Sequence, residues 1–173
     1  VHMDDANNVN VLSYSKKYKD PTMKKLLLLL FTLSSISYAE FTNDDFAIQL
    51  PKADKAIAQG GPQVAIFFLP PMDNFQANVN IQKQAFKGTI EQYKNISLAQ
   101  FEKMKFTLVK ESLLNGVLTV EYTGNMQNRD FHWYVKATKK GDSVYLVTGV
   151  APQRTWQYQG DTLRSSVDSF KLK

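Results

Sequence analysis

The chain has 173 residues, of which 43% are hydrophobic and 21% charged, and its formal net charge is +5. This length is enough for one domain with a buried core. The sequence contains no cysteine, which excludes disulfides, thiolate metal sites and a cysteine nucleophile. Its Lys and Arg residues are dispersed, and no segment carries the basic cluster that is typical of nucleic-acid-binding proteins.

A secretory signal peptide is predicted at residues 23–39. Met23 is followed by Lys24 and Lys25, an apolar run covers residues 26–33, and the segment ends at Ala39. A basic start, a short apolar stretch and small residues at the exit are the three parts of a Sec signal. The apolar run is far shorter than the ~20 residues that span a bilayer. We therefore expect Sec export with cleavage after Ala39, and a periplasmic or secreted protein.

This signal divides the chain into three predicted parts. Residues 1–22 are polar and without periodicity, so they are either a disordered extension outside the fold or upstream sequence that is not translated in vivo. Residues 23–39 are the signal peptide, and residues 40–173 are a single domain. Glu40 stands where a lipoprotein would need a cysteine, so no membrane anchor is expected.

The basic character of the chain depends partly on its first 39 residues. Five of the 21 Lys and Arg residues and three of the 16 Asp and Glu residues precede Glu40, which leaves 16 and 13 and a net charge of about +3. The charges of the remaining domain are interspersed. A nucleic acid is therefore not expected as a partner.

Strands and one helix are predicted in the first half of the domain. Residues 46–50 and 79–86 alternate between apolar and polar positions, and residues 64–69 are a continuous apolar run, so each is expected to be a strand. Thr89 can form a capping box with the glutamine three residues later, and apolar residues then recur at helical spacing. An amphipathic helix is therefore predicted over residues 89–105, packed on a sheet.

The second half is predicted to be an antiparallel meander followed by a helix. Asn115-Gly116 is a strong signal for a two-residue hairpin turn, because a type I′ turn needs positive φ at both positions. A polar loop at residues 124–129 and a Lys-Lys-Gly-Asp turn separate the later strands. The helix is predicted at about residues 153–170. The four strands are expected at residues 106–114, 117–123, 130–138 and 143–150.

The loop Pro70–Phe75, with the sequence PPMDNF, is a candidate binding lip. Its prolines restrict the backbone, and Met72 and Phe75 are apolar side chains that it could present to a partner. The alternative is a strand connection whose apolar residues pack beneath the helix.

Strand alternation places a set of polar and aromatic residues on one face of the meander. If the first hairpin has a two-residue turn, Lys110 lies opposite Glu121. If the 124–129 loop closes symmetrically, Glu121 lies opposite His132. A tight turn after the third strand then places His132 opposite Gly149, with open space above the glycine. The candidate contact residues on this face are Lys110, Glu121, His132, Tyr134 and Tyr145.

The row of Lys110, Glu121 and His132 has two interpretations. It is a polar site or an acid–base pair, in which the carboxylate favours the imidazolium, or it is cross-strand charge pairing worth about 0.2–1 kcal/mol for each pair. His132 is the only histidine after residue 39, which excludes a histidine-rich metal site. The sequence has no nucleophile elbow, P-loop, dinucleotide fingerprint or zinc-protease motif, and no cofactor is expected.

Short stretches spread over nearly all of residues 41–170 carry a resemblance to a known family. They are Leu69-Pro70-Pro71 with Phe75, Asn78–Ile81, Tyr93–Phe101, His132-Trp133-Tyr134, Val144–Thr148 and Val167–Phe170. With the order of elements, they resemble the PsbP-like superfamily, which includes the bacterial DcrB-type envelope proteins. The resemblance implies an α+β fold with a central antiparallel β-sheet flanked by helices on both faces. It also implies a non-catalytic accessory or docking role, and it supplies no catalytic residues.

Two kinds of function are consistent with these features. The first is an exported, non-catalytic binding or accessory protein that docks a protein or envelope component, as a monomer without a membrane anchor. The alternative is a small hydrolase or ligand-binding enzyme that uses Glu121 and His132. The enzyme hypothesis requires this pair to lie in a concave pocket that solvent can reach. A structural part of a larger envelope assembly would differ from the first function only in stoichiometry.

Overall fold

The computed structural model describes residues 39–50, 55–58 and 62–173 of the chain. These residues belong to one compact unit. The predicted signal peptide and the upstream residues 1–22 lie outside the described residues, so export and cleavage after Ala39 stay predictions.

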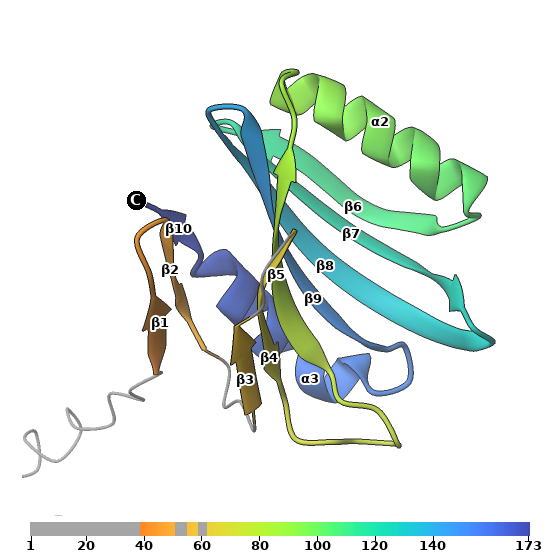
Figure 1. Cartoon of the computed structure of the whole chain (residues 1–173). Coiled ribbons are helices and arrows are strands. Elements are labelled where there is room, and N and C mark those ends of the chain that lie inside the picture. Colours follow the sequence, from red (N-terminus) through yellow and green to blue (C-terminus); the bar gives the residue numbers. More distant parts are fainter. Residues whose placement is uncertain (1–38, 51–54, 59–61) are drawn as a thin grey trace, which may run out of the picture. The chain divides into compact units, whose positions relative to one another are not determined.

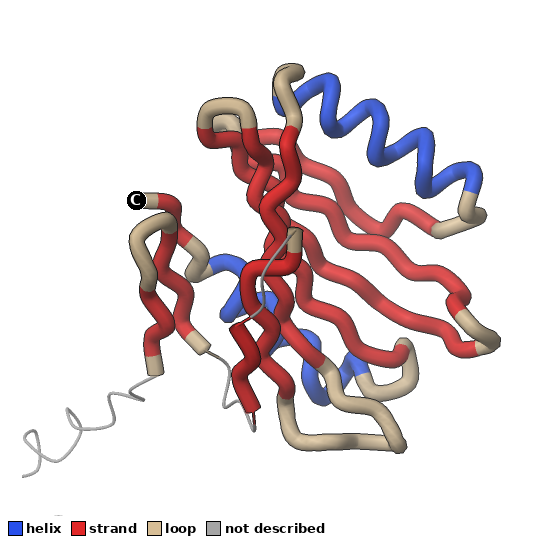
Figure 2. Tube along the Cα trace, in the orientation of Figure 1, coloured by secondary structure: helices blue, strands red, loops and turns tan. Residues whose placement is uncertain are grey.

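The described residues form two antiparallel sheets and two helices (Figure 2). The strands are β1 (Glu40–Thr42), β2 (Phe46–Gln49), β3 (Lys55–Ala58), β4 (Gln63–Phe68), β5 (Asn78–Ala85), β6 (Thr107–Leu114), β7 (Val117–Met126), β8 (Arg129–Lys140), β9 (Ser143–Pro152) and β10 (Lys171–Leu172). The helices are α2 (Ile90–Lys103) and α3 (Trp156–Asp168). The larger sheet has the strand order β3-β4-β5-β9-β8-β7-β6, and the smaller has the order β1-β2-β10 (Figure 1).

The predicted antiparallel meander is confirmed as β6–β9. Asn115 and Gly116 turn its first hairpin with φ of 51° and 75°, as a type I′ turn requires. The capping box of α2 is also present: the Gln92 N–H donates to Thr89 Oγ1 at 3.2 Å, and the Thr89 N–H donates to Gln92 Oε1 at 2.9 Å. Local sequence signals therefore determine these two element boundaries.

Strands β1, β3 and β10 were not predicted. They have three, four and two residues, and none of them shows a clear alternation between apolar and polar positions. The expected strand at residues 46–50 is β2, and it pairs with β1 and β10 instead of joining the large sheet. Two segments from opposite ends of the domain thus share the small sheet.

Two of the three hydrophobic clusters of the described residues connect a helix to the large sheet. One joins Ile90 of α2 to Leu118, Val120, Ala137 and Val144. The other joins Leu163 and Val167 of α3 to residues that include Val79, Ile81, Tyr145 and Val147. Neighbouring residues of β9 belong to different clusters, as strand alternation requires. Leu163 is fully buried, and burying a leucine side chain contributes about 1.5–3 kcal/mol, so apolar contacts hold α3 on the sheet.

The predicted register is correct for β6 with β7 and wrong for the next two strand pairs. Lys110 lies opposite Glu121, next to a β-bulge. Glu121, however, lies opposite Tyr134, and His132 lies opposite Thr123 and Ala151. The strands extend further than expected, and the positive φ of Gln127 and Asn128 makes a two-residue turn in place of the longer loop. The register error is two residues, so each side chain keeps its predicted face.

The space predicted above Gly149 is filled by α3. Gly149 lies opposite Tyr134, and a β-carbon on it would be 3.0 Å from Leu163 Cβ and 3.4 Å from Val167 Cγ2. The absence of a side chain at Gly149 therefore allows the helix to approach the sheet closely.

Candidate functional site

Glu121 and His132 form a buried pair on the face of the sheet that α3 covers. Each residue is 7% exposed, and His132 Nε2 lies 2.7 Å from Glu121 Oε1. The two residues occupy diagonal positions on β7 and β8, which still lie within reach of long side chains. The sequence therefore predicts the contact correctly, although it predicts a directly opposite pair.

α3 supplies two further members of this cluster. Arg164 Nη2 donates to Glu121 Oε1 at 2.5 Å, and the Trp156 ring stacks on the His132 ring with a centroid distance of 4.0 Å and an interplanar angle of 4°. The Arg164 guanidinium also lies 5.0 Å from the Trp156 ring centroid. We call Glu121, His132, Trp156 and Arg164 the α3 cluster.

Sequence reasoning did not consider Arg164. A signal existed, since Trp156, Gly160 and Arg164 are spaced four residues apart and therefore lie along one side of the helix. A β-carbon on Gly160 would be 2.9 Å from Trp156 Cε2. Gly160 thus leaves room for the indole that stacks on His132.

The electrostatics of the α3 cluster favour an anionic Glu121 and a neutral His132. Burial alone would raise the pKa of Glu121, but hydrogen bonds from Arg164 and His132 lower it below its ordinary value. Burial lowers the pKa of His132, and the hydrogen bond to Glu121 opposes this effect only in part. The net charge on Glu121 is therefore balanced mainly by Arg164.

This arrangement is a structural link between the sheet and α3. His132 Nε2 must donate to Glu121, because a carboxylate only accepts. In the neutral ring Nδ1 is then an acceptor, and it pairs with the side-chain amide of Gln153, whose Oε1 lies 3.1 Å away, when that amide turns its NH₂ group toward the ring. Both ring nitrogens are therefore engaged, and neither is available to a substrate. The pair lies beneath a helix and not in a pocket open to solvent, so the condition set for the enzyme hypothesis is not met.

The other predicted contact residues are separated by the structure. Lys110 is exposed on the edge strand β6, whereas Tyr145 is buried in the core with 2% exposure. Tyr134 is half-buried, and its hydroxyl donates to Asp168 Oδ1 at 3.0 Å at the end of α3. The predicted face exists, but α3 covers most of it.

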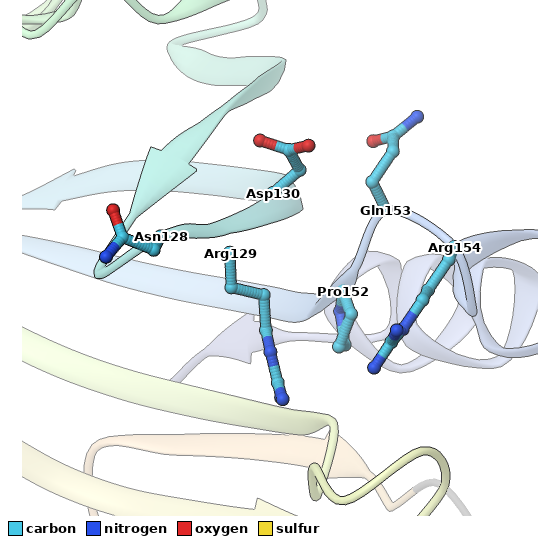
Figure 3. Close-up of a pocket in the computed structure, with 6 residues that line it drawn as sticks. All are labelled: Asn128, Arg129, Asp130, Pro152, Gln153 and Arg154. Carbon is cyan, nitrogen blue, oxygen red and sulfur yellow. The ribbon is translucent and has the colours of Figure 1, made fainter.

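A pocket of about 490 Å³ lies at the end of the sheet where β8 begins and β9 ends. Its two arginines extend to the same side, and Asp130 and Gln153 point the other way (Figure 3). Asp130 Oδ1 accepts from Asn125 Nδ2 at 2.8 Å, so this carboxylate is engaged away from the arginines. The lining residues are Asn128, Arg129, Asp130, Pro152, Gln153 and Arg154.

The predicted lip loop adjoins this pocket. Arg154 forms an ion pair with Asp73, and the Arg129 guanidinium lies 5.8 Å from the Phe75 ring centroid. Met72 and Phe75 pair across a turn in which Asp73 and Asn74 have φ of 57° and 56°.

Of the two interpretations of this loop, the one in which both apolar residues pack beneath a helix is wrong. Met72 is 39% exposed, and the Phe75 ring packs edge-on against Phe131 of β8 at 5.1 Å. We call Met72, Phe75, Arg129 and Arg154 the lip surface.

In the part of the chain that the structure describes, neither α2 nor α3 is long and apolar enough to cross a membrane. Within the same part of the chain, no three His, Asp or Glu residues are grouped closely enough to hold a metal ion.

The comparisons with known proteins define the class of fold. No protein-family model and no curated protein matches the chain. Solved structures do match, and they show that the chain has a PsbP-like fold at low sequence identity.

One such structure is the cyanobacterial PsbP protein CyanoP of Synechocystis sp. PCC 6803, with 12% identity and a TM-score of 0.55 over 82% of this chain and 96% of that one. LpqN of Mycobacterium tuberculosis, described as involved in cell envelope biogenesis, has 11% identity and a TM-score of 0.50 over 79% and 91%. PA94 of Pseudomonas aeruginosa, a protein of unknown function, has 17% identity and a TM-score of 0.55 over 73% and 91%. At these identities, the likeness concerns the fold alone.

Proposed function

We propose that the chain is a non-catalytic accessory protein of the bacterial periplasm that binds a protein partner through the lip surface. In this proposal, residues 23–39 direct export, and residues 40–173 act as a monomer. The observation that carries the proposal is the pocket lined by Arg129 and Arg154, whose side chains contact the tight turn that carries the exposed Met72.

The lip surface has the chemistry of a protein-binding site. Arginine binds carboxylates in a fixed, bidentate geometry, and arginine, methionine and aromatic residues are enriched at protein interfaces. Arg154 already pairs with Asp73 and its side chain is 62% exposed, so an incoming carboxylate can exchange with Asp73 at little cost. We therefore infer a partner that presents an acidic side chain or a chain-terminal carboxylate beside an apolar residue.

Two finer features belong to the same proposal. One is a helix on each face of the large sheet, which the alternation of clusters along β9 supports. The other is a relationship to the DcrB-type envelope proteins, which the short similar stretches support. The cell-envelope role described for LpqN is compatible with both.

Site-specific photo-crosslinking in bacterial cells tests this proposal. A photoreactive residue at Met72 is expected to give a discrete adduct with one protein. At Leu114 the same residue should give none, although Leu114 is more exposed, at 67% against 39%. Charge reversal at Arg129 and Arg154 should remove the adduct, whereas Lys87→Glu, at an exposed residue in another loop, should keep it.

Two outcomes would contradict the proposal. Equal adducts from Met72 and Leu114 would show that exposure alone determines the crosslinks. An adduct that survives the double reversal at Arg129 and Arg154 would exclude recognition by the arginines. The intact mass of the same protein tests export separately, because the proposal expects an N-terminus at Glu40.

A further inference from the structure

The contact between α2 and the sheet is much looser than that of α3. Only Ile90 is buried among the 14 residues of α2, whereas α3 buries six of its 13. Ile96 of α2 and Met104, the C-cap residue of this helix, are 50% and 53% exposed. The sheet beneath α2 nevertheless presents well-buried apolar residues, including Leu118 and Val120. The helix therefore covers an apolar surface without filling the space over it.

A cavity of about 190 Å³ lies in that space. An engineered apolar cavity of about 150 Å³ in another protein stays dry and binds benzene, so this volume is sufficient for a ring of that size or a short alkyl chain. On the side of the sheet, the cavity is lined by small and branched side chains such as Ala137 and Val135. The apolar lining residues are Phe101, Leu118, Val120, Tyr122, Val135, Ala137 and Leu146.

The rest of the lining is polar but carries no charge. Tyr93 Oη donates to Gln84 Oε1 at 2.9 Å, which links α2 to β5 beside the cavity. Burial raises the pKa of Tyr93 to about 12, so this hydroxyl stays neutral under ordinary conditions. The remaining polar members are Ser97, Gln100 and Thr148. Without a charged partner, an ionised head group would be desolvated without compensation.

We propose that this cavity binds a small neutral amphiphile, with an apolar ring or short alkyl chain against the sheet and a hydroxyl or amide at the polar residues of α2 and β5. The site is separate from the lip surface, and it shares none of its residues. Binding here would fill the space that α2 leaves open and would hold the helix more firmly on the sheet.

NMR titration of residues 40–173 with 1-hexanol and with hexanoate, two ligands of the same chain length, tests this proposal. We expect 1-hexanol to shift the methyl signals of Leu118, Val120 and Val135 in a saturable way. Hexanoate should bind at least tenfold more weakly at pH 7. Equal affinity for the two ligands would refute the neutral class, and no saturable shift with 1-hexanol would refute the site.

Matched substitutions on α2 locate the binding. Ser97→Met adds a side chain to the cavity from the helix, and Ile96→Met changes the neighbouring residue on the exposed side. The first should weaken 1-hexanol binding at least tenfold, and the second should leave it unchanged. Ala137→Met fills the cavity from the sheet and should act like Ser97→Met. If Ala137→Met prevents folding, the test rests on Ser97→Met, and unchanged 1-hexanol binding in the Ser97→Met variant would overturn the proposal.

Discussion

Removing the guanidinium of Arg164 tests whether the α3 cluster stabilises the attachment of the helix. In Arg164→Met, the Glu121 carboxylate loses its 2.5 Å hydrogen bond and stays buried beside a neutral imidazole. Hydrogen bonds to charged groups contribute about 1.5–3 kcal/mol, and breaking a fully buried ion pair costs about 3–5 kcal/mol. The Arg164 side chain is 34% exposed, so water replaces part of the loss. We expect the free energy of unfolding at pH 7 to fall by about 2 kcal/mol.

The loss should depend on pH in a defined direction. In the wild type, the pKa of Glu121 is held below the ordinary value of 4.5. The ionised group therefore contributes stability above that pH, and the contribution is lost as the pH falls through the folded-state pKa. Without Arg164, burial raises the pKa of Glu121, and the carboxyl group becomes neutral on mild acidification. The difference between variant and wild type should therefore shrink below about pH 5.

Urea unfolding of residues 40–173, followed by circular dichroism at pH 7 and pH 4.5, measures this effect. Lys110→Met is the matched control, because Lys110 lies directly opposite Glu121 in the sheet but is exposed. It should change stability by less than about 0.5 kcal/mol. A comparable loss in the two variants, or a loss in Arg164→Met that is the same at both pH values, would refute the reasoning.

Three further results are expected. Burial lowers the pKa of His132 below 6.5 in the folded state. The unfolded state therefore binds more protons near pH 6.5, and the free energy of unfolding should fall on acidification from pH 7 to 5. In urea unfolding, His132→Gln should reduce this dependence on pH. Alanine is more favourable than glycine in a helix by about 1 kcal/mol. Gly160→Ala should nevertheless lower the free energy of unfolding, because its methyl group displaces the Trp156 ring. Near-ultraviolet circular dichroism should detect the changed packing of this ring. Gly116→Ala should cost about 1 kcal/mol in the same unfolding assay, since φ there is 75°.

The large sheet could be predicted because its strands are long and its decisive turns are local. Asn115-Gly116 determined the first hairpin, and the alternation in β7, β8 and β9 assigned each side chain to its observed face. The next turn was misplaced because Gln127, unlike Asn128, is not a usual residue for positive φ. The pairing of the small sheet could not be predicted, since β2 and β10 lie near opposite ends of the domain's sequence.

The site was predicted less completely than the sheet, for a different physical reason. Strand alternation correctly predicts that Glu121 and His132 lie on one face, but it does not predict which helix residue lies above them. Arg164 is 43 residues from Glu121 in the sequence, and their contact depends on where α3 crosses β8 and β9. Such tertiary contacts follow from packing, which no local pattern in the chain encodes.

The contrast between the α3 cluster and the lip surface explains why the most conspicuous polar residues are not the proposed binding residues. A buried carboxylate is stable only when its hydrogen bonds and charge are satisfied internally, and Glu121 meets this condition through Arg164 and His132. A side chain that recognises a partner must instead keep donors exposed, which favours turns at the ends of strands. Arg129 and Arg154 occupy such positions, and Gln153 lies between the two regions, lining the pocket while its amide contacts His132. The buried cluster therefore holds in place the chain segment from which Arg154 reaches the lip surface.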